Sequence, residues 1–101
     1  MILIFTTFHK KLDARKIGKS LLKQKLIACY SLFPVESAYW WKKKIVDDKE
    51  FLMILKTKET NFTNIEAYIK SHSGYEIPEV VAIKASRVNK PYLSWITKET
   101  S

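Results

Sequence analysis

Two long stretches of strand-forming residues, separated by a short run of lysines, constrain this chain most. Residues 27–41 are rich in aromatic and β-branched side chains, and residues 45–57 contain the apolar segment 51–55, which is the composition of β-strands. Residues 42–44, all lysine, lie between them, where a hairpin would turn. Both stretches exceed the usual strand length of about 5–6 residues. The sequence therefore predicts an unusually long β-hairpin.

The rest of the chain alternates between strand and helix patterns. Residues 2–8 begin with an unbroken apolar run, which predicts a buried, central strand. Apolar residues at helical spacing predict one helix that is capped by Asp13 and another that starts at residues 60–61. Residues 79–86 are expected to form a fourth strand. Pro91 suits the first turn of a closing helix.

The order βαββαβ, followed by a terminal helix, is the split βαβ or ferredoxin-like pattern. We therefore predict an α+β, ferredoxin-like sandwich with a long hairpin between its second and third strands, in a single domain that covers residues 1–101. Pro34 cannot donate a hydrogen bond to a sheet, so we expect it at an edge, a bulge or a bend. Gly18 would allow the first helix to pack closely on the sheet.

Composition and charge exclude several classes of protein. The formal charge is +8, and sixteen of the eighteen cationic residues are lysine. Proteins that read nucleic acids usually rely on arginine, so we interpret the excess mainly as surface solvation. The single cysteine excludes an internal disulfide, and no apolar stretch approaches the ~20 residues that span a bilayer. We expect a cytoplasmic protein.

The surplus length of the predicted hairpin indicates a partner. Its end carries Tyr39, Trp40, Trp41 and Ile45, and exposed aromatic residues at a strand end are typical of interfaces. An overlong strand also offers unpaired backbone groups to another chain. We predict a homo-oligomer built through these residues. The alternative is that the terminal helix, with Trp95, folds back over the two tryptophans.

No catalytic constellation is visible, and we expect that the protein is not an enzyme. Cys29 is a soft ligand that suits Cu(I) or zinc, and His9 and His72 are the only imidazoles. Neither His-x-x-x-His nor Cys-x-x-Cys spacing occurs, so no preformed transition-metal site is visible within the chain. An acidic cluster on the predicted third strand would suit a hard cation or pair with nearby lysines: Asp47, Asp48 and Glu50.

Several short motifs stand along nearly the whole chain. They are Ile4-Phe5-Thr6-Thr7, Leu26-Ile27-Ala28-Cys29 with Pro34 beyond it, Ser37-Ala38-Tyr39-Trp40-Trp41, Lys44-Ile45, Met53-Ile54-Leu55-Lys56-Thr57, Tyr75-Glu76-Ile77-Pro78-Glu79-Val80 and Tyr92-Leu93-Ser94-Trp95. Each is weak alone, but their order and spacing together resemble the CutA family of divalent-cation tolerance proteins.

The resemblance implies a ferredoxin-like subunit in a tight homotrimer whose hairpins pair between subunits. It also implies a protein that binds metal ions, copper among them, without needing a cofactor to fold. The metal ligands that the resemblance implies are Cys29, His72 and Glu79. The pocket that it implies between subunits contains Lys56, Tyr75 and Trp95.

The chain departs from the family pattern in two places. Lys42-Lys43 stands where relatives usually have Glu-Gly, and Ser73-Gly74 stands where they usually have His-Pro, with His72 one residue earlier.

Three other functions fit the same element order. The first is a trimer of the PII type that binds nucleotides or small molecules. The second is an RNA-recognition module, but the K/R-G-F/Y-G/A-F signature is missing. The third is an acyl-phosphate hydrolase, but the predicted first loop has no arginine to hold phosphate; the two arginines are Arg15 and Arg87. We expect no nucleic-acid partner and no membrane contact.

Overall fold

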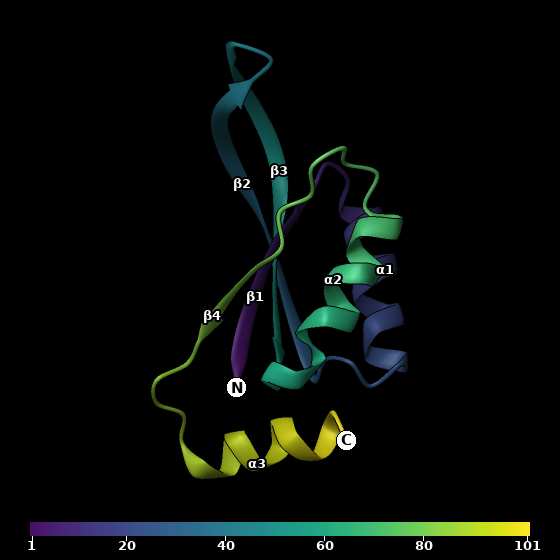
Figure 1. Cartoon of the computed structure of the whole chain (residues 1–101), viewed down its shortest axis with the longest axis vertical. Helices are drawn as coiled ribbons and strands as arrows, with labels where there is room; N and C mark the ends of the chain where they lie inside the picture. Colours follow the sequence, from purple (N-terminus) through teal and green to yellow (C-terminus); the bar gives the residue numbers. More distant parts are fainter.

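The computed structural model describes residues 1–101 and has the predicted order of elements (Figure 1). The elements are β1 Ile2–Phe8, α1 Lys11–Lys23, β2 Cys29–Trp41, β3 Lys44–Thr57, the single 3-10 turn η1 Glu59–Asn61, α2 Phe62–His72, β4 Val81–Lys84 and α3 Lys90–Glu99. None of the helices is long and apolar enough to cross a membrane.

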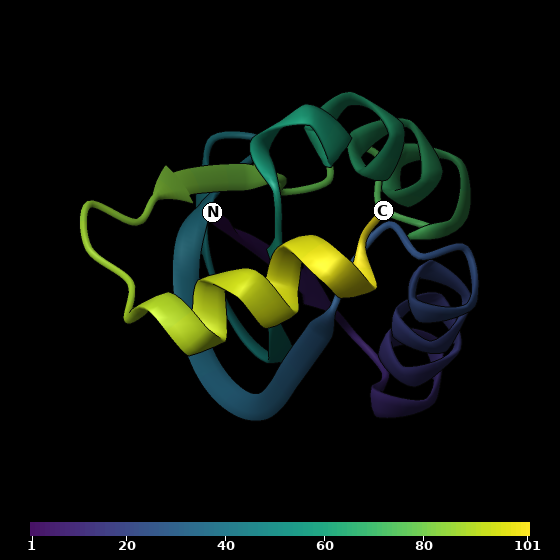
Figure 2. The same cartoon turned by 90° about the horizontal axis from the view of Figure 1, so that it is seen from below.

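The four strands form one antiparallel sheet in the order β2-β3-β1-β4. The predicted central position of β1 is confirmed, since it lies between β3 and β4. Pro34 lies on the edge strand β2, which is where a sheet tolerates proline. Helices α1 and α2 lie side by side on one face of the sheet, and α3 crosses its lower end (Figures 1 and 2).

The core fills the space between the sheet and the first two helices. Alternate residues of β1 are buried, and Ile4 stands opposite Leu55 of β3, both fully buried. Leu21 of α1 and Ile65 of α2 belong to the same buried cluster and contribute to it from the helices. A Cβ added at Gly18 would lie 2.8 Å from the ring of Tyr30 on β2, so the expected close packing of α1 on the sheet is confirmed.

Two expectations about element ends are wrong. Helix α1 begins at Lys11 with Lys10 as N-cap, so Asp13 does not cap it. Asp13 lies instead within the first turn, where a negative charge still interacts favourably with the helix dipole. Strand β4 covers only Val81–Lys84 rather than residues 79–86, because its pairing with β1 runs only from Ile2 to Phe5.

The β2–β3 hairpin projects well beyond the body of the subunit. The molecule measures 45 × 26 × 21 Å, and the hairpin tip lies at one end of the long axis while α3 lies at the other (Figure 1). Trp40 keeps 71% of its surface exposed. The alternative in which the terminal helix folds back over Trp40 and Trp41 is therefore wrong for this chain.

The hairpin turns through two lysines in an unfavourable backbone conformation. Lys42 has φ of 49° and Lys43 has φ of 66°, between the paired residues Trp41 and Lys44. Two-residue turns with positive φ at both positions match the twist of the strands, but they favour Asn-Gly because a Cβ is strained there. Lys43, which stands where relatives usually have glycine, therefore adopts a backbone conformation that is strained for lysine.

We predict that Lys43→Gly stabilises the protein by about 1 kcal/mol, because glycine adopts positive φ without steric cost. Urea unfolding followed by circular dichroism measures the change. Lys44→Gly is the matched control, since it removes the same charge from a residue that belongs to β3, where glycine destabilises. Equal stabilisation by both variants would show that charge, rather than backbone strain, is responsible.

Candidate metal centre and adjoining cavity

Acidic side chains gather where β1 ends and the sheet narrows to the projecting hairpin. Asp48 and Glu50 lie two residues apart on β3, so they point to the same face. His9 directly follows β1, whose last residue Phe8 stands opposite Phe51. The ligand atoms of His9, Asp48 and Glu50 all lie within 4.8 Å of one another. We call these three residues the His9 cluster.

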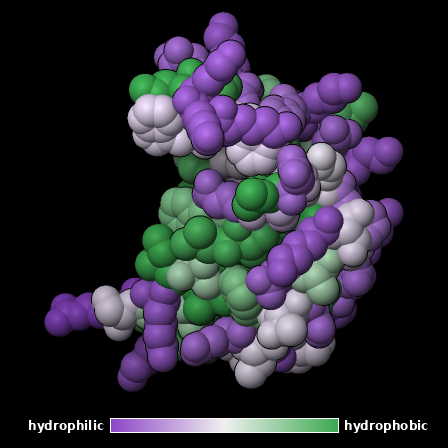
Figure 3. Space-filling view, turned by 45° about the horizontal axis from the view of Figure 1, so that its top comes forward, coloured by the Kyte–Doolittle hydropathy of each residue, from purple (hydrophilic) through white to green (hydrophobic).

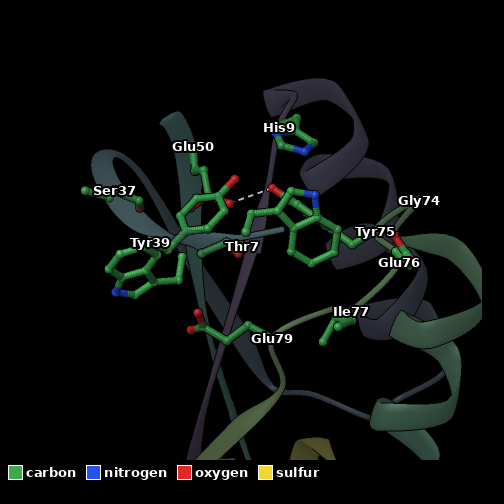
Figure 4. Close-up of a pocket in the computed structure, with 13 residues that line it drawn as sticks. Thr7, His9, Ser37, Tyr39, Glu50, Gly74, Tyr75, Glu76, Ile77 and Glu79 are labelled. Atoms are coloured by element: carbon green, nitrogen blue, oxygen red, sulfur yellow. Dashed lines mark hydrogen bonds between the residues drawn. The ribbon is translucent and has the colours of Figure 1, made fainter. Parts of the chain in front are cut away.

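Two phenols hold the carboxylates of the His9 cluster in place. Tyr39 donates a 2.9 Å hydrogen bond to Oδ2 of Asp48, and Tyr75 donates a 2.6 Å bond to Oε2 of Glu50, which Figure 4 draws as a dashed line. The Nδ1 atom of His9 lies 3.4 Å from the same oxygen of Asp48. The His9 ring packs on the Tyr75 ring with centroids 4.3 Å apart.

Glu50 is a buried carboxylate without a lysine or arginine partner. Its exposed fraction is 7%, and the lysine–carboxylate pairs of the chain lie elsewhere, at Lys70–Glu66 and Lys84–Glu59. A buried carboxylate is costly unless it is paired and hydrogen-bonded. The Tyr75 hydroxyl supplies a hydrogen bond but no charge, so the site favours a cation.

Burial and negative charge perturb the titrating groups around the cluster. Burial, with the hydrogen bond to Glu50, raises the pKa of Tyr75 far above its ordinary value. The hydrogen bond to Asp48 raises the pKa of Tyr39. Both phenols therefore remain protonated donors at neutral pH. Burial, followed by repulsion from Glu50, raises the pKa of Glu79, which is the direction that a concentration of negative charge produces.

A cavity of about 710 Å³ adjoins the cluster. Residues 37–41 of β2 line one side, and the segment 74–79 before β4 lines the other. Figure 4 shows Glu50 and His9 entering from above, Glu79 from below, and the rings of Tyr39 and Tyr75 at the sides. The lining includes carboxylates and aromatic rings but no lysine or arginine.

The structure brings some of the predicted site residues together. Tyr75 and Glu79 both line the cavity, and so do the hairpin residues Tyr39, Trp40 and Trp41. Their common position follows from the loop after α2, which returns to β4 beside the base of the hairpin (Figure 1).

The remaining predicted residues lie elsewhere in the subunit. Cys29 stands opposite Lys56 where β2 begins, and the Nζ atom of Lys56 lies 5.6 Å from the Tyr92 ring of α3, which neighbours Trp95. His72 ends α2, where its Nδ1 atom lies 2.8 Å from the Tyr68 carbonyl oxygen. One subunit thus does not assemble Cys29, His72 and Glu79, so the ligation by these three residues that the resemblance implies would need more than one subunit and stands as the alternative to the His9 cluster.

His9 is the functional candidate that sequence reasoning did not select. It was visible as one of two imidazoles, and Asp48 and Glu50 were visible as a pair on one strand face. The missing information was the β1–β3 register, which sets Phe8 opposite Phe51 and so brings the next residue beside Glu50.

Comparison with known proteins gives a consistent result along the whole chain. Residues 2–99 match the family described as CutA1 divalent ion tolerance protein. The chain is 41% identical over 100 residues to the divalent-cation tolerance protein CutA of Pyrococcus horikoshii, covering 99% of this chain and 98% of that protein. It is 38% identical over 96 residues to the protein of the same name from Thermotoga maritima, covering 95% of each.

Solved structures agree with this assignment. A crystal structure of CutA1 from Pyrococcus horikoshii matches with a TM-score of 0.95 at 40% identity, covering 100% of this chain and 99% of that one. A structure from Archaeoglobus fulgidus, described as a periplasmic divalent cation tolerance protein CutA, matches with a TM-score of 0.97 at 35% identity and full coverage of both chains. These names give no support to the PII-type alternative. The shared fold, the family match over residues 2–99 and the identity to full-length relatives together show that this chain belongs to the CutA family of divalent-cation tolerance proteins.

Proposed function

We propose that this protein contributes to divalent-cation tolerance by binding a divalent transition-metal ion, copper(II) above all, in a homotrimer. The observation that carries the proposal is the His9 cluster, where an imidazole and two carboxylates converge within 4.8 Å. The proposed role is binding rather than catalysis.

The donor set of the cluster fits such an ion. Imidazole suits copper and zinc, carboxylate oxygens complete mixed N,O sites, and affinity among divalent first-row metals peaks at Cu²⁺. With bonds of about 2.0–2.2 Å, two ligand atoms on opposite sides of one ion lie ~4.4 Å apart. The atoms of the cluster therefore need only small side-chain movements to bind one ion.

The phenols act as outer-shell partners of the proposed ligands. Tyr39 and Tyr75 each donate to one carboxylate of the cluster, and such partners orient metal ligands and tune their affinity. Because the pKa of each phenol is raised, the hydroxyls stay protonated and keep this orienting role at neutral pH.

The uncovered face of the sheet supports the trimer. Helices cover only one face (Figures 1 and 2), and Figure 3 shows hydrophobic side chains gathered on the side away from the helices. Phe33 of β2 and Val81 and Ile83 of β4 keep 42%, 49% and 50% of their surface exposed. Apolar patches of this kind mark interaction sites. Identical copies would cover this face, and the hairpin residues Tyr39, Trp40, Trp41 and Ile45 would extend the contact.

We predict that His9→Ala and Glu50→Gln each weaken copper(II) binding at least tenfold, because each removes a ligand from the cluster. Isothermal titration calorimetry measures the affinity. Electron paramagnetic resonance of the copper(II) complex should show coupling to an imidazole nitrogen that disappears in His9→Ala.

His72→Ala and Cys29→Ala are the matched controls, since they remove the other imidazole and the only thiol. Both variants should bind copper(II) as the parent protein does. Loss of binding in these two variants with full binding in His9→Ala would place the ion at the ligands that the family resemblance implies, and would overturn the assignment to the His9 cluster.

We also predict a solution mass of three times the 11.8 kDa subunit, measured by light scattering on a size-exclusion column. Ile83→Lys should lower the mass, because it places a charge on the uncovered sheet face. Leu12→Lys on α1, 67% exposed on the helix side, should leave the mass unchanged. A parent protein that runs as a monomer would contradict the prediction.

A further inference from the structure

The positive charge of the chain is concentrated on one short segment. Residues 10–25, which comprise α1 and its two ends, contain seven lysine and arginine residues and one acidic residue, Asp13, for a net charge of +6. The rest of the chain has eleven cationic and nine acidic residues, for a net charge of +2. Solubility requires no such concentration, because mixed charges spread over the surface serve it equally well.

Helix α1 turns these charges outward on one face. Its buried residues, Ile17 and Leu21 among them, face the sheet. The opposite face, which we call the cationic face, consists of exposed residues at intervals of three or four and one beside them: Leu12, Lys16, Lys19 and Lys23, with Arg15. Figures 1 and 2 show α1 on the side of the molecule away from β4. The cationic face is therefore separate from the uncovered face of the sheet.

This arrangement of charge is unfavourable for the helix itself. Lys19 stands four residues from both Arg15 and Lys23, and like charges at that spacing destabilise a helix. Lys10 and Lys11 stand at the N-terminal end, where the helix dipole favours negative charge. Elements that violate such local rules are expected where a function requires it.

No carboxylate of the chain compensates these charges. The ion pairs of the structure involve His9, Lys70 and Lys84, so none of the cations of α1 belongs to one. The unpaired charges create a positive potential over the cationic face, which attracts a negatively charged partner. Such a partner would also relieve the repulsion within α1.

Leu12 distinguishes between kinds of negatively charged partner. It is 67% exposed, and Arg15 and Lys16 are its neighbours in the next turn of the helix. An apolar side chain bordered by charged ones is typical of protein interfaces. Phosphates offer a leucine no contact, and the face has no aromatic ring on which a base could stack. Helices that bind membrane surfaces insert a whole apolar face, whereas that of α1 is buried in the core.

We propose that the cationic face of α1 binds an acidic segment of another protein. Carboxylates of that segment would face the lysines, and an apolar side chain within it would contact Leu12. From Leu12 to Lys23 the helix rises about 16 Å, which matches roughly five residues of extended chain. The proposal goes beyond metal binding and the trimer, and it depends on neither.

Fluorescence anisotropy of a labelled peptide tests the proposal. The probe is the fluorescein-labelled peptide Glu-Glu-Leu-Glu-Glu-Glu, titrated with the full-length protein at about 0.15 M salt, where long-range attraction is largely screened. It should bind saturably. The same peptide with glutamine in place of every glutamate should not bind. A peptide with alanine in place of the leucine should bind about threefold more weakly, because it buries less apolar surface against Leu12.

Variants locate the binding on α1. Lys19→Glu should weaken binding at least tenfold, and it should raise the melting temperature because the new carboxylate faces Arg15 and Lys23. Lost binding then cannot result from unfolding. Lys90→Glu is the matched control, since it makes the same charge change at an exposed residue that begins α3; it should bind as the parent protein does. Leu12→Ser should weaken binding of the leucine peptide but not of the alanine peptide.

Four outcomes would overturn the proposal. No saturable binding of the glutamate peptide would show that the face takes no acidic segment. Equal binding of the glutamine peptide would show that charge is not recognised. Equal losses in Lys19→Glu and Lys90→Glu would show attraction by net charge alone. Tighter binding of a duplex oligonucleotide, or of phosphatidylserine vesicles, at the same salt concentration and sensitive to Lys19→Glu, would identify the partner as a nucleic acid or a membrane instead.

Discussion

The difference in length between β1 and its neighbour β3 governs this structure. Strand β1 has seven residues and β3 has fourteen, and their pairing stops at Phe8 and Phe51. Beyond that point β3 has only β2 as a strand neighbour. The side of β3 that β1 leaves free is filled by His9 and by the loop before β4, which is how Asp48 and Glu50 become partly or fully enclosed.

Enclosure without a cationic partner makes this region chemically distinctive. Two surface carboxylates of the chain pair with lysines, Glu66 with Lys70 and Glu59 with Lys84. Glu50, which is buried, has only the hydroxyl of Tyr75. Hydrogen bonds from neutral phenols orient a carboxylate but leave its charge uncompensated. The proposed metal ion would supply the missing positive charge beside Glu50.

The same long strands connect the site to assembly. The hairpin that carries Asp48 also carries Trp40 and Ile45, which are 71% and 64% exposed, and one side of the cavity is a wall of β2. In the proposed trimer, a contact made by the hairpin would therefore act directly on the lining of the cavity. A ligand that orders this lining would also order the surface through which the subunits meet.

The sequence by itself determined the elements and much of their placement. An unbroken apolar run indicated β1 as a central strand, and aromatic and β-branched composition indicated the long hairpin. Apolar residues at helical spacing indicated the two amphipathic helices, because burial requires that spacing wherever a helix meets a core. Only the tertiary structure decided the site. Whether His9 lies beside Glu50 depends on the register between β1 and β3, and the start of β4 at Val81 depends on where its pairing with β1 begins, at Phe5. These positions result from packing between segments that are distant in the chain, so no local pattern of side chains predicts them.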